Sequence, residues 1–322
     1  MARSLLTGAS GFVGGAVHEC LSKNSPHKLT VVLRKPIPAL AVTTSVTQVE
    51  QIDGLTDWGS ILLNCNVVVH ATARVHVMHE SSLDPIESFR KVNVEVEGTL
   101  NLARQAARLG VGRFIFISSI KVNGEGTSLN VPYTADDEPA PTDPYGISKM
   151  EAEKGLTLIA SQTGMEVAIV PPVLVYGPSV KANFFNMMRW LCKGVSLPFG
   201  TIYNRQSLVV LDNLVDLIVT CIDHPLAANQ IFLVGDDEGL SATELLKRMG
   251  SASGKSARLL AMPSEVLSFS AALLGKKSIF QRLCGSLQVD ISKNRELLGW
   301  TPSLSLDKTL DATTKYFVDS CA

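Results

Sequence analysis

Short apolar runs alternate with longer amphipathic stretches along the first three quarters of the chain. The runs expected to form strands lie at residues 4–6, 29–33, 67–70, 113–118, 167–170 and 230–234. Helical spacing of apolar positions predicts helices between them, which include residues 86–109 and 145–164. Strands that alternate with helices are typical of a parallel sheet covered by helices on both faces. The pattern therefore predicts an α/β fold with a doubly wound parallel sheet.

A glycine-rich turn follows the first strand. Residues 7–14 read Thr-Gly-Ala-Ser-Gly-Phe-Val-Gly, and a helical pattern through Val17, Cys20 and Leu21 comes next. Glycines there let the backbone bend tightly and approach a pyrophosphate, whose charge then lies at the helix N-terminus. A tight turn without a ligand is the alternative, but the flanking strand and helix favour dinucleotide binding. The expected contacts are Gly8, Ser10, Gly11, Phe12, Val13 and Gly14.

Loops, prolines and glycines become more frequent after Pro171. Helical pieces are expected there at residues 184–193, 212–223, 242–251 and 264–274. We expect residues 1–170 to form a Rossmann domain that binds NAD(P), and residues 171–322 to form mainly a smaller substrate-binding lobe. Some later segments are expected to return to the first domain.

Composition excludes several classes of protein. The formal net charge of the 322 residues is −1, so no basic surface for nucleic acid is expected. The six cysteines lack metal-ligand spacing, which favours free thiols in a reducing compartment and no metal site. No apolar run reaches the roughly 18 residues of a membrane span, and no signal peptide is evident. A cytoplasmic protein is expected.

Tyr145 and Lys149 are four residues apart, which puts a phenol and an ammonium group on one face of a helix. A free tyrosine has a pKa near 10, so a nearby positive charge is needed before it exchanges protons at neutral pH. Lys149 is placed to supply that charge. An ordinary helix start with a solvated lysine is the alternative, and the glycine turn favours the catalytic interpretation.

Together these motifs resemble the extended, nucleotide-sugar-modifying branch of the short-chain dehydrogenase/reductase superfamily. Residues 93–99, 116–119, 175–178, 290–293 and 298–300 extend the resemblance over nearly the whole chain. It implies that Ser119 completes a catalytic trio with Tyr145 and Lys149. Because side chains alternate along a strand, Ser118 is expected to point the other way. The resemblance also implies a homodimer formed through helices 86–109 and 145–164.

Cofactor choice is expected to be set at the end of the second strand, where NAD enzymes offer a carboxylate to the ribose. This strand ends with Arg34 and Lys35 and has no acid nearby, which favours NADP(H), with NAD(H) still possible. A surface pair of cations is the alternative. The resemblance implies further cofactor contacts at Asp53, Ala71, Thr72, Ala73, Asn93, Tyr145, Lys149, Pro172 and Val173.

The resemblance implies chemistry at C4 of a UDP-sugar. We expect NADPH-dependent reduction of the C4 ketone of a UDP-4-keto-6-deoxy-N-acetylhexosamine, in the synthesis of surface polysaccharide precursors. An NAD-dependent UDP-hexose 4-epimerase is the alternative. A 4,6-dehydratase is disfavoured because Ile120, which follows Ser119, cannot donate a proton. A non-catalytic NADP-binding regulator would be expected to have lost Tyr145 or Lys149.

Substrate contacts are expected from several loops and helices. The resemblance implies that Arg205 clamps a phosphate, since a guanidinium group matches phosphate geometry, with an ordinary arginine on a surface loop as the alternative. Arg282 is a second candidate, although the family's pattern around it is missing here. Lys121 lies where dehydratases place a base, although a substrate contact or a solvated lysine is equally consistent with its position. The full expected set is Arg74, His76, Lys121, Asn123, Asn183, Arg205 and Arg282.

Overall fold

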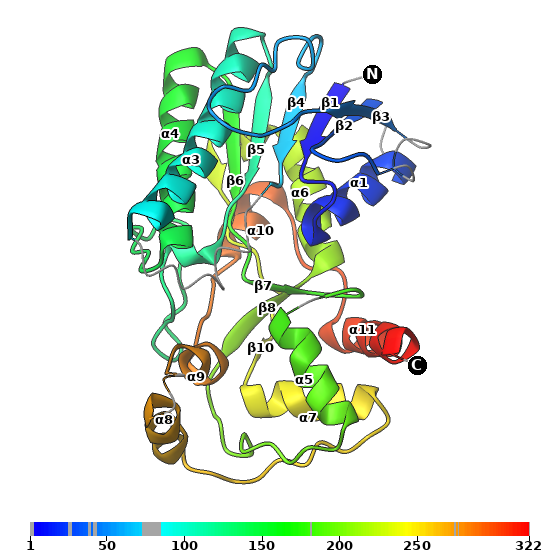
Figure 1. The fold of residues 1–322 in the computed structure, drawn as a ribbon, viewed down its shortest axis with the longest axis vertical. Helices are drawn as coiled ribbons and strands as arrows, with labels where there is room; N and C mark the ends of the chain where they lie inside the picture. The colour runs from blue at the N-terminus through cyan, green and yellow to red at the C-terminus, as the bar shows by residue number, and fades with distance from the viewer. Residues whose placement is uncertain are drawn as a thin grey trace.

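A seven-stranded parallel sheet forms the centre of the protein in a computed structural model (Figure 1). The structure describes residues 3–24, 28–37, 40, 44–72, 85–180, 182–273, 275 and 277–321. The strand order is β3-β2-β1-β4-β5-β6-β9. The strands are β1 (Arg3–Thr7), β2 (Lys28–Leu33), β3 (Ser45–Gln48), β4 (Val67–His70), β5 (Arg113–Ile117), β6 (Glu166–Val170) and β9 (Gln230–Ile231). The predicted doubly wound fold is confirmed.

Helices cover both faces of this sheet. The helices α3 (Pro85–Arg108) and α4 (Pro144–Thr163) lie on one face, and α1 (Phe12–Asn24) and α6 (Leu211–Asp223) lie on the other (Figure 1). Every residue of β4 and β5 is buried. Strands buried on both faces read as continuous apolar runs, which is why the sequence revealed them clearly.

The start of α4 is fixed by its own sequence. Asp143 caps the helix, since its side chain accepts a hydrogen bond of 2.7 Å from the backbone N–H of Gly146. Pro144 occupies the first turn, where its missing N–H costs nothing. Gly164 ends the helix in the left-handed conformation. These signals fix the first turn of the helix, and Tyr145 lies in that turn.

A second, smaller sheet lies below the first in Figure 1. It contains β7 (Leu174–Tyr176), β8 (Gln206–Val210) and β10 (Gly239–Leu240). Around it lie α5 (Ala182–Cys192), α7 (Ala242–Ala252), α8 (Ser264–Leu273), α9 (Lys277–Cys284) and α11 (Leu306–Cys321). The chain also forms α10 (Ser292–Leu298) and the short 3-10 helices η2 (Ile120–Val122) and η3 (Pro225–Ala227). Both α6 and β9 return to the first sheet, with β9 paired to β6.

The structure differs from the sequence prediction at two places. The strand expected at 230–234 ends at Ile231, although Phe232, Leu233 and Val234 are buried. Burial alone made that run look like one strand. The three strands of the smaller sheet were not predicted, because two of them contain only two or three residues. Among the described residues, no helix is long and apolar enough to cross a membrane.

Candidate active site

In the glycine turn between β1 and α1, Gly8 and Gly14 lie very close to neighbouring backbone carbonyl groups. Gly8 has a φ of +81°, and a Cβ atom there would lie 2.5 Å from the carbonyl oxygen of Ala71. A Cβ atom on Gly14 would collide with the carbonyl oxygen of Gly8. The turn can therefore fold only with glycine at these two positions. The N-terminus of α1 follows directly after this turn, and a helix N-terminus attracts a phosphate group.

Ser119 and Tyr145 line one cavity of about 350 Å³ at the carboxyl ends of β5 and β6, which we name the inner cavity. The Ser119 hydroxyl is close enough to the phenol to lower the pKa of Tyr145. Ser118 hydrogen-bonds Glu153 on α4 instead, so the two serines point in different directions as predicted. Carboxyl ends of parallel strands are where this fold class collects its reactive groups.

Lys149 lies one turn after Tyr145 and is only 1% exposed. Its Nζ atom donates a hydrogen bond of 3.3 Å to the carbonyl oxygen of Ile117 and lies 4.6 Å from the centre of the Phe116 ring. The centre of the Tyr145 ring is 5.8 Å away. Burial lowers the pKa of Lys149, and the carboxylate of Glu95 opposes that effect. The lysine is thus held between β5 and α3, behind the phenol.

Glu95 on α3 is a site residue that the sequence did not single out. Its Oε1 atom lies 3.4 Å from Nζ of Lys149 and accepts no hydrogen bond from any described residue. The sequence does hold one signal for Glu95, which is its spacing from Thr99. Thr99 contacts the buried His70, so the residue one helical turn earlier, Glu95, shares that inward face of α3. The side chain of Asn93, which the resemblance implies as a cofactor contact on the same helix, lies outside the described residues.

The pKa of Tyr145 differs from the sequence expectation. Burial raises the pKa of the phenol, and Glu95 and Asp143 raise it further, whereas the hydrogen bond with Ser119 lowers it. Burial is the largest of these contributions. The phenol therefore needs added positive charge nearby before it can accept a proton from a hydroxyl group near neutral pH.

A small cavity between β4 and α3 is lined by two buried oxygen atoms that have no hydrogen-bond partner among the described residues, although the Glu95 carboxylate also pairs with Lys149. These atoms are Oγ1 of Thr72 and Oε1 of Glu95. An unpartnered buried polar atom is costly, and a bound polar ligand removes that cost. The ribose hydroxyls of a dinucleotide have the matching donors and acceptors. Together with the open glycine turn, these atoms fit NAD(P), which the described residues Gly8, Gly14, Thr72 and Glu95 would hold.

Arg34 lines the same small cavity as Glu95. The sequence argument for NADP(H) assumed that no acid lies near Arg34 and Lys35, and α3 supplies one from a distant part of the chain. A carboxylate favours a free ribose hydroxyl and repels a 2′-phosphate, while an arginine does the opposite. The end of β2 therefore does not decide between the two dinucleotides by itself.

The other predicted cofactor contacts are distributed along the carboxyl edge of the sheet. Pro172 and Val173 line the inner cavity. The side chain of Asp53 accepts hydrogen bonds from the N–H of Leu55 and the hydroxyl of Thr56, each 3.0 Å long, within its own turn. Ala71 is half-buried beside the glycine turn, and Ala73 lies outside the described residues.

The predicted substrate residues fall into three groups. Lys121 and Arg282 line the inner cavity, and Lys121 is paired with Glu125 and Asp143. Asn123 is buried and does not line that cavity, and Arg205 is exposed outside it. Arg74, His76 and the side chain of Asn183 lie outside the described residues. Of the described set, Lys121 and Arg282 are thus the charged groups nearest the reacting centre.

Comparisons with known proteins identify the family of this chain. Residues 4–235 match the model of the NAD dependent epimerase/dehydratase family. The chain belongs to this family. It is 45% identical over 317 residues to a UDP-glucose 4-epimerase of Vibrio cholerae, which covers 98% of this chain and 95% of the relative.

Solved structures of family members share the fold at lower identity. A UDP-glucuronic acid 4-epimerase of Bacillus cereus in complex with NAD superposes with a TM-score of 0.79 at 20% identity, covering 99% of this chain and 100% of that one. A UDP-glucose 4-epimerase of Thermotoga maritima with UDP-glucose gives a TM-score of 0.77 at 22% identity, with the same coverage. At this identity the two structures support the fold alone.

Proposed function

We propose that this protein is an NAD-dependent 4-epimerase of UDP-hexoses. The observation that carries the proposal is the shared cavity of Ser119 and Tyr145, with Lys149 buried directly behind the phenol. The 45% identity to the Vibrio cholerae UDP-glucose 4-epimerase over nearly the whole chain supports the substrate class. The sequence motifs alone favour a 4-ketoreductase, whereas the relatives favour the epimerase alternative.

Each residue of the trio has a distinct role in this reaction. Tyr145 takes the proton of the C4 hydroxyl as the sugar is oxidised and returns a proton to that oxygen as it is reduced. Ser119 hydrogen-bonds the same oxygen and keeps it within reach of the phenol. Lys149 holds a positive charge behind the phenol and stabilises its deprotonated form. The bound dinucleotide would supply a hydride acceptor, a hydride donor for the return step, and a positive charge.

NADPH-dependent reduction of a UDP-4-keto sugar is the second candidate. Arg34 and Lys35 are both exposed at the end of β2, and two cations there favour a 2′-phosphate. A 4,6-dehydratase has less support. Ile120 is buried and apolar, and the ammonium group of Lys121 is paired with two carboxylates.

Cofactor release and turnover separate the candidates. The purified protein is denatured, and any released dinucleotide is identified by mass. UDP-glucose and UDP-galactose are then incubated with the native protein, with and without added NAD. Interconversion of the two sugars without net cofactor consumption supports the epimerase. Stoichiometric NADPH oxidation by a UDP-4-keto-6-deoxy-N-acetylhexosamine, with no interconversion of hexoses, would establish the reductase instead.

A further inference from the structure

The side chain of Lys121 links the two segments that carry Ser119 and Tyr145. Its Nζ atom lies 2.5 Å from Oε1 of Glu125 and donates a hydrogen bond to Oδ2 of Asp143. Asp143 caps α4, the helix that carries Tyr145. Lys121 itself lies in η2, which begins directly after Ser119. An ion pair therefore joins the turn of one reactive group to the helix start of the other.

The position of Ser119 depends on the backbone of η2. The hydroxyl oxygen of Ser119 accepts a hydrogen bond of 3.4 Å from the backbone N–H of Lys121, and its carbonyl oxygen accepts one of 3.0 Å from Val122. The N–H of Ile120 donates to the carbonyl oxygen of Pro172 at 3.1 Å. A shift of η2 therefore moves the Ser119 hydroxyl with it.

The start of α4 lies directly against η2. A Cβ atom on Gly146 would lie 2.6 Å from the carbonyl oxygen of Lys121, so the two backbones are in contact. Both carboxylate oxygens of Asp143 are used, because Oδ1 accepts the N–H of Gly146 at 2.7 Å while Oδ2 accepts from Lys121. Tyr145 lies between Asp143 and Gly146 in the chain. The ion pair therefore acts on the turn that holds the phenol.

The cluster is partly sheltered from water. The side chains of Lys121, Glu125 and Asp143 are 17%, 26% and 24% exposed, and partly buried ion pairs are screened by salt much less than exposed ones. Burial raises the pKa of Asp143, but hydrogen bonds from Lys121 and Gly146 outweigh burial and leave the pKa below its usual value. Asp143 is therefore ionised near neutral pH and keeps its charge for Lys121.

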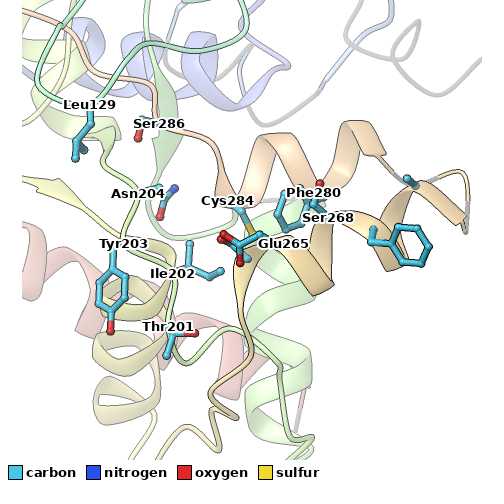
Figure 2. A pocket seen from close by; sticks show the side chains of 13 residues that line it. Leu129, Thr201, Ile202, Tyr203, Asn204, Glu265, Ser268, Phe280, Cys284 and Ser286 are labelled. Atoms are coloured by element: carbon cyan, nitrogen blue, oxygen red, sulfur yellow. The ribbon is translucent and has the colours of Figure 1, made fainter.

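Arg282 also lines the inner cavity, but it belongs to a different part of the fold. Its carbonyl oxygen accepts a hydrogen bond of 2.7 Å from the side chain of Gln206 on β8. Residues 204–207 and 283–287 are hydrogen-bonded to each other, and they separate the inner cavity from an open cavity of about 820 Å³ (Figure 2). Arg282 is thus fixed to the smaller sheet and does not tie η2 to α4.

We propose that Lys121 is a positioning residue that fixes the approach of Ser119 to Tyr145, because it ties η2 to the capped start of α4. The inference rests on the proposed C4 chemistry, in which both hydroxyl groups reach one substrate oxygen. A misplacement of about 1 Å costs on the order of 10²-fold in rate. Loss of the tie therefore lowers kcat, whereas loss of a substrate contact would raise KM.

A double-mutant cycle in the interconversion of UDP-glucose and UDP-galactose by the holoenzyme tests the tie. Lys121→Met removes the charge, and Lys121→Arg keeps it. Asp143→Asn keeps an oxygen that caps α4 but removes the charge that pairs with Lys121. The double variant Lys121→Met/Asp143→Asn completes the cycle. Lys154→Met, the same substitution at an exposed position of α4, is the matched control.

The expected result separates kcat from KM. In Lys121→Met and in Asp143→Asn the kcat falls about 10- to 100-fold, while the KM for UDP-glucose changes less than about threefold. The double variant loses about as much as the larger single loss, because both substitutions remove the same contact. Lys121→Arg keeps a kcat at least about fivefold above that of Lys121→Met, because a guanidinium group still pairs with Asp143. Lys154→Met changes neither value.

Three results would overturn the assignment. Losses of kcat that multiply in the double variant would show that Lys121 and Asp143 act independently. A raised KM with an unchanged kcat in Lys121→Met would make Lys121 a substrate contact instead. An unchanged kcat in Asp143→Asn refutes the tie even if Lys121→Met does not fold, because Asn still caps α4.

A failure of the proposed function has a different signature. Wild-type protein that does not interconvert the two UDP-hexoses refutes the epimerase, and amide hydrogen exchange then tests the tie without substrate. The N–H groups of Gly146 and Ile147 both donate to Asp143. Their exchange should be at least about threefold faster in Lys121→Met than in the wild type or in Lys154→Met. Equal exchange in all three proteins would overturn the tie.

Discussion

Glu153 on α4 gives the protein a pH-dependent stability that can be measured without substrate. Its carboxyl group is 7% exposed and accepts a hydrogen bond from Ser118. Burial raises the pKa of Glu153 from 4.5 to about 7, although the hydrogen bond and Lys149 oppose the shift. Between these two pH values the folded protein keeps a proton that the unfolded chain has lost. Raising the pH through this window therefore destabilises the folded state.

The size of this effect follows from the width of the window. A shift of this size removes about 3 kcal/mol of the free energy of unfolding, at about 1.4 kcal/mol for each pH unit. His70 acts in the opposite sense, since burial lowers its pKa to about 3 and stability is lost as the pH falls below 6.5. The two effects overlap in the wild type. A variant that changes only Glu153 separates them.

Glu153→Gln keeps an oxygen that accepts the Ser118 hydrogen bond but has no titrating proton. Urea unfolding at pH 5 and pH 8 measures the free energy of unfolding of both proteins. We expect the variant to gain about 3 kcal/mol over the wild type between these pH values. Glu151→Gln, an exposed change on the same helix, is the control and should gain nothing. A gain that does not vary with pH would refute the assignment of a buried, protonated Glu153.

Three further substitutions test other parts of the account. Gly8→Ala should lower the free energy of unfolding by about 1 to 3 kcal/mol and weaken NAD binding, measured by urea unfolding and fluorescence titration, because φ is positive and Ala71 blocks the Cβ. Glu95→Gln should move the basic limb of the pH profile of kcat to lower pH by about one unit, because Lys149 loses its carboxylate partner. An unchanged basic limb would remove Glu95 from the site. Glu97→Gln, an exposed change on the same helix, is the control. Arg113→Met should cost about 3 to 5 kcal/mol in urea unfolding, since Glu166 and three carbonyl groups lose their buried donor.

The sequence was most informative where a short motif carries its own geometry. The glycine turn and the spacing of Tyr145 and Lys149 each predict a local structure, and the structure brings Ser119 and Tyr145 to one cavity. Continuous apolar runs predicted the strands of the large sheet because both of its faces are buried. These signals depend on neighbouring residues only, so one sequence is enough to see them.

The remaining features depend on how distant segments pack. Glu95 reaches Lys149 only because α3 and α4 lie side by side on one face of the sheet. A cavity of about 820 Å³ joins residues 201–204 to α8 and α9, about 60 to 80 positions later in the chain. The pKa of Tyr145 could not be inferred from the nearby lysine, because burial and Glu95 raise it. A pattern along the chain does not contain these contacts.

The most direct test of the central claim is the rate of UDP-glucose and UDP-galactose interconversion by Tyr145→Phe. The phenylalanine ring retains the shape of the side chain and removes only its hydroxyl group. If Tyr145 transfers the proton at C4, the rate falls about 10² to 10⁴-fold while the bound dinucleotide is retained. Interconversion at a near-wild-type rate would contradict the account and exclude Tyr145 as the catalytic acid and base.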